Sequence, residues 1–349
     1  MIGNKHHKLL PKVSILTATL NPNLKIFRLS LESIKNQDYP KNLIQQIIMD
    51  GGSNNGAIDL ARLYKCKIMV RPDLGLESEG GHTRIVQGIK MATGSIILLL
   101  ESDNILTSRK WVKELIIPFL ENKEVFCTYS MHNSYKANMN ITTRYCALFG
   151  SPDPTLYYLK KTEKIRLDQE SYDKGKIIKS YKKYYVARFN NKNLPTLGDN
   201  GHMILKSVLV KVISNLDEYI HVDAFQQLLS LGYDTFGVVK NSIIHVQNPN
   251  LIDLVKRRIE VKKIFYDQKK KKRKYLVFNP SSKKDIINLV KYVIFSLTLI
   301  VTIFESVRGY LKIQDKAWFL HPVLCIMFVF GYGFSELENK TKLLFNTKI

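Results

Sequence analysis

The sequence predicts an α/β fold, with a mostly parallel sheet, flanking helices and a helical hairpin near the C-terminal end. Over residues 13–100, β-branched apolar runs alternate with segments of helical spacing, as in parallel strands joined by helical crossovers. The fourth run, residues 96–100, contains only Ile and Leu, which is typical of a strand that is buried on both faces. Two long apolar segments after residue 285 predict the hairpin.

Hydrophobic spacing and turn residues define the elements of the first hundred residues. Residues 13–20 predict a strand, which the turn residues Asn21 and Pro22 close. Residues 24–36 predict a helix, because their apolar side chains recur every three to four positions. The Gly- and Asn-rich turn at residues 50–56 lets the backbone turn tightly and approach a ligand. The other predicted elements are strands at 44–49 and 67–71, helices at 57–64 and 83–93, and a loop at 72–81.

The regular alternation is lost between residues 130 and 193, where Tyr and Lys are frequent. We interpret this stretch as an insertion on the acceptor side of the site that carries specificity, since variable segments on a rigid scaffold often do so. Interleaved Tyr and Lys suit a membrane interface or single-stranded nucleic acid equally well. A loop at 194–201, a helix at 224–231 and a strand at 237–244 complete a predicted domain of residues 1–250.

The composition indicates a partner that carries dense negative charge. The formal net charge is +23, so nucleic acid, an anionic membrane surface or a phosphorylated substrate are the expected classes. Much of the positive charge lies in residues 256–284. The four cysteines lack metal-ligand spacing and indicate a reducing compartment rather than a disulfide framework. The polar segment 1–12 predicts that no cleavable signal peptide is present.

Two carboxylates, Glu101 and Asp103, directly follow the buried run at 96–100. Open α/β sheets bind ligands at the carboxyl ends of their strands, and alternation along an extended strand end points both side chains to one side. Carboxylates aimed at one spot repel each other unless a cation lies between them, and Mg²⁺ and Mn²⁺ prefer oxygen ligands. The alternative is a solvated junction between a strand and a turn.

Four segments, in this order and spacing, resemble the family 2 glycosyltransferases, which have the Rossmann-like GT-A fold. They are residues 13–21, the Asp-Gly-Gly-Ser turn at 50–53, the Gly-Ile-Lys-Met-Ala-Thr-Gly run at 88–94 and Glu-Ser-Asp at 101–103. The resemblance covers roughly residues 11–250. It implies that Thr17, Thr19 and Asp50 hold the nucleoside of a sugar nucleotide, and that contacts to the donor lie around His82 and Arg84.

The same resemblance implies a divalent metal, Mn²⁺ or Mg²⁺, that bridges the donor diphosphate. Asp103 is the implied ligand, and Glu101 replaces the first Asp of the family's Asp-x-Asp motif. His245 stands where a late histidine completes the metal site in several GT-A enzymes; the alternative is a structural histidine. Arg257 and Arg258 are expected to close over the diphosphate, because Arg forks match phosphate oxygens, or else to form a solvated basic face.

The resemblance also implies a general base, because in the family an acidic residue before a helix that ends in a Gly-aromatic pair supplies it. Asp223 precedes such a helix, which ends at Gly232 and Tyr233. Asp223 is therefore the implied base, with Asp199 in the loop at 194–201 as the reserve candidate. The competing interpretation is that Asp223 only caps the helix, since Asp is a preferred N-cap residue.

The C-terminal segments predict attachment to a membrane. Residues 286–304 and 317–335 are each nineteen long and nearly uncharged, close to the roughly 20 residues that span a bilayer. Residues 251–285 then form a basic juxtamembrane segment and residues 336–349 a tail. Basic residues beside a spanning helix mark the cytoplasmic side and attract anionic lipid, which disfavours nucleic acid as the partner. An in-plane or re-entrant hairpin remains the alternative.

Together these features predict a membrane-anchored, metal-dependent, inverting glycosyltransferase of the hexosyltransferase type. It would move a sugar from a nucleotide-sugar donor to a hydroxyl of a lipid-linked or surface-glycan acceptor, with its catalytic domain in the cytoplasm. One alternative is transfer onto polyprenyl phosphate, which needs no deprotonation of a hydroxyl. Another is a membrane-tethered module that binds nucleotide sugar without catalysis.

Overall fold

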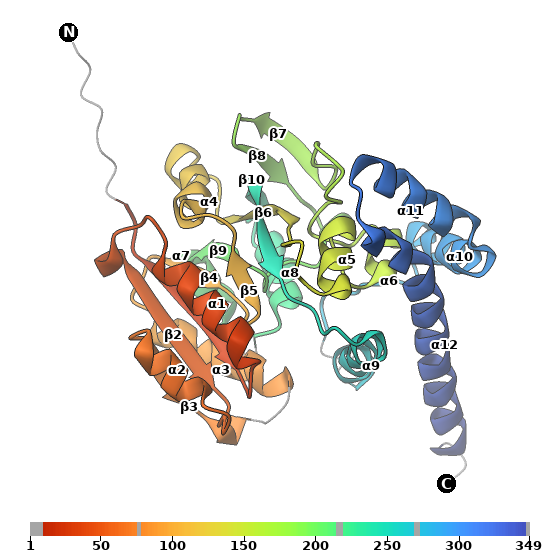
Figure 1. The fold of residues 1–349 in the computed structure, drawn as a ribbon, viewed down its shortest axis with the longest axis horizontal. Coiled ribbons are helices and arrows are strands. Elements are labelled where there is room, and N and C mark those ends of the chain that lie inside the picture. The colour runs from red at the N-terminus through yellow and green to blue at the C-terminus, as the bar shows by residue number, and fades with distance from the viewer. Residues whose placement is uncertain (1–9, 75–77, 214–218, 269–272, 347–349) are drawn as a thin grey trace. The chain divides into compact units, whose positions relative to one another are not determined.

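The chain folds into two compact units, whose elements are labelled in Figure 1. The computed structural model describes residues 10–74, 78–213, 219–268 and 273–346. The first unit consists of Met1–Met131 and Lys174–Ile243, and the second consists of His132–Asp173 and Ile244–Ile349. The residues of the predicted insertion, 130–193, are therefore divided between the two units.

The first unit begins with a parallel layer of strands and connecting helices, as predicted. Its strands, in spatial order, are β3 (Lys67–Val70), β2 (Ile44–Asp50), β1 (Val13–Thr19) and β4 (Ile96–Leu99). The helices between them in the chain are α1 (Leu24–Lys35), α2 (Ala57–Leu63) and α3 (Ser78–Met91). Asn23 caps α1 by accepting a hydrogen bond from the Ile26 amide, so the predicted turn also starts the helix.

Two expectations for this layer are corrected. The loop predicted at 72–81 contains a 3₁₀ turn, Pro72–Leu74, and α3 already begins at Ser78; residues 75–77 lie outside the described part of the chain. The two glycines in the first turn of α3 lower its intrinsic helix propensity by about 1 kcal/mol each. Burial of Val86 and Ile89, which lie on one face of α3, favours the helix.

The second half of the sheet is antiparallel, so the sheet as a whole is mixed. In the described part of the chain the strand order is β3-β2-β1-β4-β9-β6-β10-β8-β7, with β5 pairing β10. The additional strands are β5 (Asn104–Leu106), β6 (Cys127–Asn133), β7 (Lys176–Ser180), β8 (Tyr184–Arg188), β9 (His202–Leu205) and β10 (Thr235–His245). β9 runs antiparallel to both β4 and β6. The prediction of a mostly parallel sheet therefore holds only for the first four strands.

Side chains from the sheet and its helices form the core of the first unit. The remaining helices of this unit are α4 (Trp111–Glu121), α7 (Lys206–Ile213) and α8 (His221–Ser230). Trp111 is fully buried, and its indole nitrogen donates to Ser130 Oγ at 3.1 Å and to the Ser242 carbonyl at 3.0 Å. These bonds fix the start of α4 against the middle of β6 and the C-terminal part of β10.

The second unit is helical, apart from the ends of two strands. Its helices are α5 (Ile141–Phe149), α6 (Pro154–Tyr158), α9 (Leu251–Lys262), a π-helical segment Lys263–Gln268, α10 (Lys283–Thr298), α11 (Ile300–Lys312), a 3₁₀ turn Lys316–Phe319 and α12 (Leu320–Asn346). Phe149, Trp318 and Phe328 are buried together in its core. Tyr157 and Tyr158, in the predicted Tyr- and Lys-rich insertion, also pack within this unit.

The two apolar C-terminal segments differ in form. Lys316–Thr341 is long and apolar enough to cross a membrane by length and composition. The single helix predicted at 286–304 is instead two helices, α10 and α11, that meet at an angle of 82°. The break lies at Leu299, which has a positive φ of 62° and so cannot continue a right-handed helix.

Candidate functional site

The ends of β1 and β2 form the first part of the site. Thr19 pairs in register with Asp50, and Thr17 lies two residues earlier on the same face of β1. All three side chains are buried. No hydrogen bond to Thr19 Oγ1 is found within the described residues, although that oxygen is buried. A buried hydroxyl of this kind is suited to a ligand that supplies the missing partner.

Asp50 organises the glycine turn that follows β2. Its Oδ1 accepts hydrogen bonds from the amides of Gly52, at 2.8 Å, and Ser53, at 2.6 Å, and its Oδ2 accepts one from Ser53 Oγ at 2.6 Å. A carboxylate has about four lone-pair sites, so these three bonds leave capacity for another donor. The structure thus gives Asp50 a role in holding the turn, beyond the nucleoside contact that the resemblance implies.

Arg84 of α3 brings a positive charge to this turn. A Cβ on Gly51 would lie 2.9 Å from Arg84 Nη1, so only glycine lets the guanidinium approach so closely. Arg84 is 2% exposed; burial lowers the pKa of its guanidinium, and the nearby charge of Asp50 opposes that effect. The side chain of His82, implied beside Arg84 in the sequence, lies outside the described part of the chain.

Glu101 and Asp103 lie in a turn beyond the end of β4. The amide of Asn104 donates to the Glu101 carbonyl at 3.1 Å and closes the turn. The strand itself ends at Leu99. Alternation along an extended strand therefore does not describe the directions of the two carboxylates, and that step of the sequence argument is wrong. Their shared position at the carboxyl end of a parallel strand is as predicted.

Asn104 links this carboxylate turn to the loop before β9. Its Oδ1 accepts from the Glu101 amide at 3.3 Å, and its Nδ2 donates to Asp103 Oδ1 at 3.3 Å and to Asn200 Oδ1 at 3.2 Å. Asn200 Nδ2 in turn donates to Asp199 Oδ1 at 2.8 Å. Asn104 is completely buried. Two of the predicted site residues, Asp103 and Asp199, are thus joined through two asparagine side chains.

The chain of polar contacts continues to α8. His221 Nε2 lies 3.7 Å from Asp199 Oδ2, close enough for an ion pair when the imidazole is protonated. Asp223 follows in the first turn of α8 and is 7% exposed. The N-cap of this helix is Ile220, so the interpretation of Asp223 as an N-cap is wrong. The helix begins three residues earlier than predicted, because residue 220 already has the extended conformation of a cap.

The carboxylate turn fits a divalent cation that arrives together with a phosphorylated ligand. Within the described residues, no group of three or more His, Cys, Asp or Glu side chains is placed to hold a metal ion. Glu101 and Asp103 offer carboxylate oxygens, the ligands that Mg²⁺ and Mn²⁺ prefer. Mg²⁺ is commonly bound by one or two carboxylates together with waters and substrate phosphates. The donor set therefore suits shared coordination better than a preformed protein cage.

The remaining predicted site residues belong to the second unit. His245 is the last residue of β10 and is partly buried. Arg257 and Arg258 lie in α9; Arg257 is exposed and Arg258 is partly buried. Burial raises the pKa of Asp153, the N-cap of α6, and the charge of Arg258 opposes that rise. Arg258 therefore has a stabilising electrostatic contact within its own unit.

Three residues of the polar chain received no role from sequence reasoning: Asn104, Asn200 and His221. Asparagine is common in turns, so the residue type alone does not single out Asn104 or Asn200. Only their positions in the sequence could have marked them as part of the site, since Asn104 directly follows Asp103 and Asn200 directly follows Asp199. What joins them is the antiparallel pairing of β9 with β4, which a pattern of local spacing does not reveal.

The parallel half-sheet, the Asp-Gly-Gly-Ser turn with its buried aspartate and the carboxylate turn after β4 define a glycosyltransferase of the GT-A fold. The family model described as Glycosyl transferase family 2 matches residues 14–205, more than half of the chain. The chain therefore belongs to glycosyl transferase family 2. This finding confirms the resemblance inferred from the sequence.

Solved structures resemble this chain at low sequence identity, and the first of the two below shares its fold. A mannosyltransferase from Pyrobaculum calidifontis, in complex with GDP-Man and Mn²⁺, is 11% identical, with a TM-score of 0.52 over 95% of this chain and 88% of its own. Glucosyl-3-phosphoglycerate synthase from Mycobacterium tuberculosis, in complex with Mn²⁺ and UDP-glucose, is 15% identical, with a TM-score of 0.45 over 73% and 78%. No curated protein sequence matches the chain.

Proposed function

We propose that the protein is a membrane-associated, divalent-metal-dependent, inverting glycosyltransferase. It transfers a hexose-like sugar from a nucleotide sugar to a hydroxyl of a lipid-linked or surface-glycan acceptor. The observation that carries the proposal is the polar chain from Asp103 through Asn104 and Asn200 to Asp199. These hydrogen bonds connect the turn that carries Glu101 and Asp103 to the loop before β9. Donor and acceptor can therefore be held by one connected set of side chains.

The donor end of the proposal rests on the buried residues of β1, β2 and α3. Thr17, Thr19 and Asp50 bind the nucleoside, which is supported by the buried Thr19 hydroxyl and by the remaining acceptor capacity of Asp50. Arg84 lies beside the same turn, and its planar guanidinium suits the oxygens of a diphosphate. Arg257 is assigned to the diphosphate in the same way, with Arg258 in support.

Asp103 and Glu101 hold Mn²⁺ or Mg²⁺ in this proposal, together with His245. When bound, such an ion stabilises the charge that develops on a departing diphosphate, as a Lewis acid. Family membership supports the need for this stabilisation, because the leaving group of a nucleotide sugar is a nucleoside diphosphate. The Mn²⁺ in the mannosyltransferase structure is an observation on that protein, and it is in line with the proposal.

Asp223 accepts the proton of the acceptor hydroxyl as the sugar is transferred. A positioned carboxylate is an established type of general base. Asp199 is the reserve candidate, and its contact with His221 supports a role in proton handling or in orienting the loop.

Features of the second unit support the proposed class of acceptor. The apolar, exposed side chains of α10, α11 and α12 and the basic residues around them support a site at the cytoplasmic face of a membrane. An acceptor carried on a lipid, or a growing surface glycan, is available at that face. The region from residue 251 onward then serves as the membrane-associated part of the chain.

Transfer in membranes tests these assignments. Membranes that contain the full chain are incubated with labelled sugar nucleotides and Mn²⁺, and label is followed into lipid and glycan fractions. Asp223→Asn is expected to lose transfer, while Asp59→Asn, an exposed change in α2, retains it. Undiminished transfer by Asp223→Asn into a phosphate-linked lipid would identify polyprenyl phosphate as the acceptor instead. Binding of a donor without any turnover, whatever the metal, would identify a non-catalytic module.

A further inference from the structure

The helices α10 and α11 each carry an exposed apolar stripe on one face. The exposed apolar residues of α10 are Ile286, Ile287, Val290, Ile294 and Leu297. Those of α11 are Ile300, Ile303, Phe304, Val307 and Leu311. Apart from the adjacent pairs at 286–287 and 303–304, successive residues are three or four positions apart, which places each set on one side of its helix. Ile300 and Leu311 are 74% and 76% exposed, so these faces are open.

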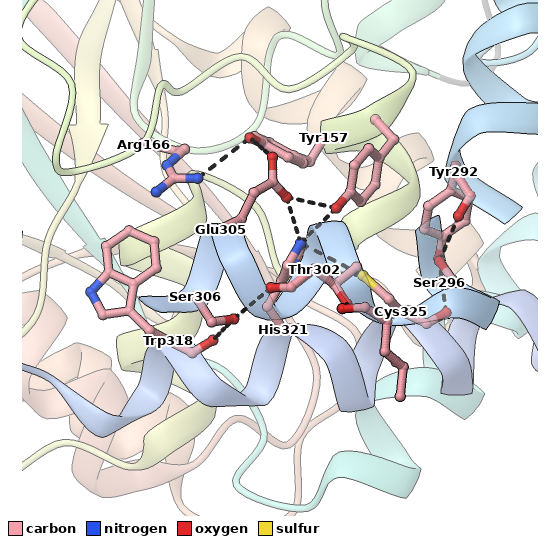
Figure 2. Close-up of polar contacts among 12 residues, drawn as sticks. Tyr157, Arg166, Tyr292, Ser296, Thr302, Glu305, Ser306, Trp318, His321 and Cys325 are labelled. Carbon is pink, nitrogen blue, oxygen red and sulfur yellow. Dashed lines mark hydrogen bonds and ion pairs between the residues drawn. The ribbon is translucent and has the colours of Figure 1, made fainter. Parts of the chain in front are cut away.

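The opposite faces of the same helices are polar and buried, as Figure 2 shows. The Glu305 carboxylate of α11 accepts hydrogen bonds from Tyr157 at 3.0 Å and from Tyr158 at 2.6 Å, and lies 3.2 Å from His321 Nε2. Ser306 Oγ donates to the Trp318 carbonyl at 2.9 Å. The arrangement inverts that of a water-soluble helix, with polar groups inside and large aliphatic groups outside, and it suits a lipid environment.

The break at Leu299 keeps these helices from acting as one straight span. α10 has 16 residues and α11 has 13, which correspond to about 24 Å and 20 Å at 1.5 Å per residue. Each is shorter than the hydrocarbon core of about 30 Å. Glu305 holds α11 against α6 and α12, and Tyr292 of α10 donates to the Cys325 carbonyl of α12 at 3.2 Å. Both helices of the bent pair are therefore held by the same unit, and straightening the pair would break the contacts of one of them.

α12 is also one-sided along its length. Its exposed apolar residues, Phe319 in the preceding turn and Val323, Phe330, Phe334 and Leu337, lie on one face. Outside this apolar face, Glu336 pairs with Lys262 at 2.5 Å and Glu338 pairs with Lys263 at 2.7 Å. The opposite face of α12 is not open to lipid, because Leu324 and Phe328 are buried in the core of the second unit and the C-terminal part of the helix is tied to Lys262 and Lys263 through charges.

Basic side chains border the apolar stripes. Lys291 of α10 and Arg308 and Lys312 of α11 are exposed and lie at the edges of those faces on a helical projection. Lys283 and Lys284 begin α10, and Lys316 follows α11; all three are exposed. Long basic side chains at the edge of an apolar face reach the headgroup level of a bilayer, where they attract anionic lipids.

We infer that α10, α11 and α12 form an in-plane, monotopic anchor that enters only one leaflet of an anionic membrane and does not cross it. The inference rests on the membrane association in the proposed function, but not on its transfer chemistry. In this arrangement the three helices lie in the plane of the membrane surface, in place of the spanning hairpin expected from the sequence. No segment of the chain then crosses to the other side of the bilayer. Lipid-linked acceptors would then be reached from the leaflet that holds the anchor.

Cysteine labelling at three exposed positions tests the topology of the full chain in membranes. Each cysteine shows on which side of the membrane one part of the chain lies. Lys192→Cys is in the first unit, Gln314→Cys is between α11 and α12, and Lys340→Cys is near the end of α12; all three positions are exposed. A membrane-impermeant maleimide is applied to sealed vesicles of both orientations. The unaltered chain gives the background, which should be low because Cys127, Cys146 and Cys325 are buried. Burial also raises the pKa of the Cys66 thiol to about 12.

The inference predicts that all three cysteines are labelled from the same side. Labelling of Gln314→Cys from the side opposite to Lys192→Cys would show a spanning hairpin and overturn it. Labelling of Lys340→Cys alone from the opposite side would show that α12 crosses, and would overturn it as well. Neither result bears on sugar transfer, so failure here is distinct from failure of the proposed enzymatic function.

Flotation with vesicles tests the partner of the apolar faces. The purified chain should float with vesicles of anionic lipid and about tenfold less with neutral phosphatidylcholine. Ile300→Asp should lose flotation, while Leu63→Asp, at a position that is also 74% exposed but lies in α2, should retain it. Unchanged flotation of Ile300→Asp would contradict the proposal that these faces bind lipid. A soluble dimer that does not bind vesicles would also contradict it, and would indicate that a second copy of the chain covers the apolar faces.

Discussion

At the scale of single residues, the site depends on a buried amide that sequence reasoning left without a role. Asn104 contacts Asp103, the Glu101 amide and Asn200, and it has no exposed surface. A buried polar group that satisfies several partners fixes their positions, and its removal leaves those partners short of hydrogen bonds. We therefore treat Asn104 as a positioning residue for Asp103 and for the loop that contains Asp199.

Asn104→Ala tests this positioning role. Loss of the amide should reduce kcat by about 10–100-fold, as for partners that orient metal ligands, and weaken the dependence on Mn²⁺. Asn190→Ala, at an exposed position after β8, serves as the control, because its side-chain oxygen accepts from the nearby amides of Lys192 and Asn193. A parent-like kcat and metal dependence in Asn104→Ala would show that the polar chain is structural only.

His132 provides a prediction about pH and stability. Burial lowers the pKa of its imidazole below the usual value of about 6.5. The imidazole therefore binds a proton more strongly in the unfolded chain than in the folded chain. The free energy of unfolding should fall as the pH drops below about 6.5. His132→Gln should reduce the decrease in the thermal unfolding midpoint between pH 7.5 and pH 5. An identical decrease in both proteins would rule out this contribution.

At the scale of elements, the sequence predicted what local spacing controls and missed what tertiary contacts control. The strands at 13–19, 44–50 and 96–99 and the helix at 24–35 follow from apolar runs, spacing and turn residues. The bend at Leu299 carries no such signal, because leucine favours helices and no glycine or proline is near it. The Glu305 contacts that accompany the bend come from residues about 150 positions away, 157 and 158.

Substitution of Leu299 shows whether the bend is present in the folded protein. Leu299→Gly and Leu299→Ala both remove the leucine side chain, so the difference between their stabilities depends on the backbone conformation at residue 299. If residue 299 is left-handed, Leu299→Gly should be more stable than Leu299→Ala by about 1 kcal/mol. In a straight helix the order would reverse, because glycine costs roughly 0.5–1 kcal/mol relative to alanine there. Thermal unfolding of the two variants in detergent decides between them.

The contact between α11 and the turn before α12 gives a second test at this scale. A Cβ on Gly309 would lie 2.5 Å from the Trp318 ring, whereas one on Gly333 would meet nothing within 4 Å. Gly309→Ala should therefore destabilise the second unit by about 1–3 kcal/mol. Gly333→Ala, in α12, should be neutral or slightly stabilising because alanine favours helices. Equal unfolding midpoints for the two variants would contradict this packing.

At the scale of the whole molecule, the order of motifs was enough to predict the GT-A half but not the division of the chain. Residues 132–173 fold with the C-terminal helices, although they interrupt the first unit in sequence. Tyr157 and Tyr158 look like an exposed aromatic and basic surface in the sequence, and burial against Glu305 gives them a different role. The order of motifs also located Glu101 and Asp103 directly after β4 and Asp223 in the first turn of α8, and the catalytic roles predicted for them are tested by the variants of Asp103 and Asp223.

The most direct test of the central claim measures metal-dependent turnover of the donor. The full chain in detergent is supplied with a panel of UDP- and GDP-sugars, and release of nucleoside diphosphate is followed with Mn²⁺ and with EDTA. At least one donor should be hydrolysed with Mn²⁺ and not with EDTA. Asp103→Asn should slow that reaction by about 100-fold or more, while the surface control Asp59→Asn should match the parent. Equal turnover by Asp103→Asn and the parent, or no turnover of any donor in the panel, would contradict the account.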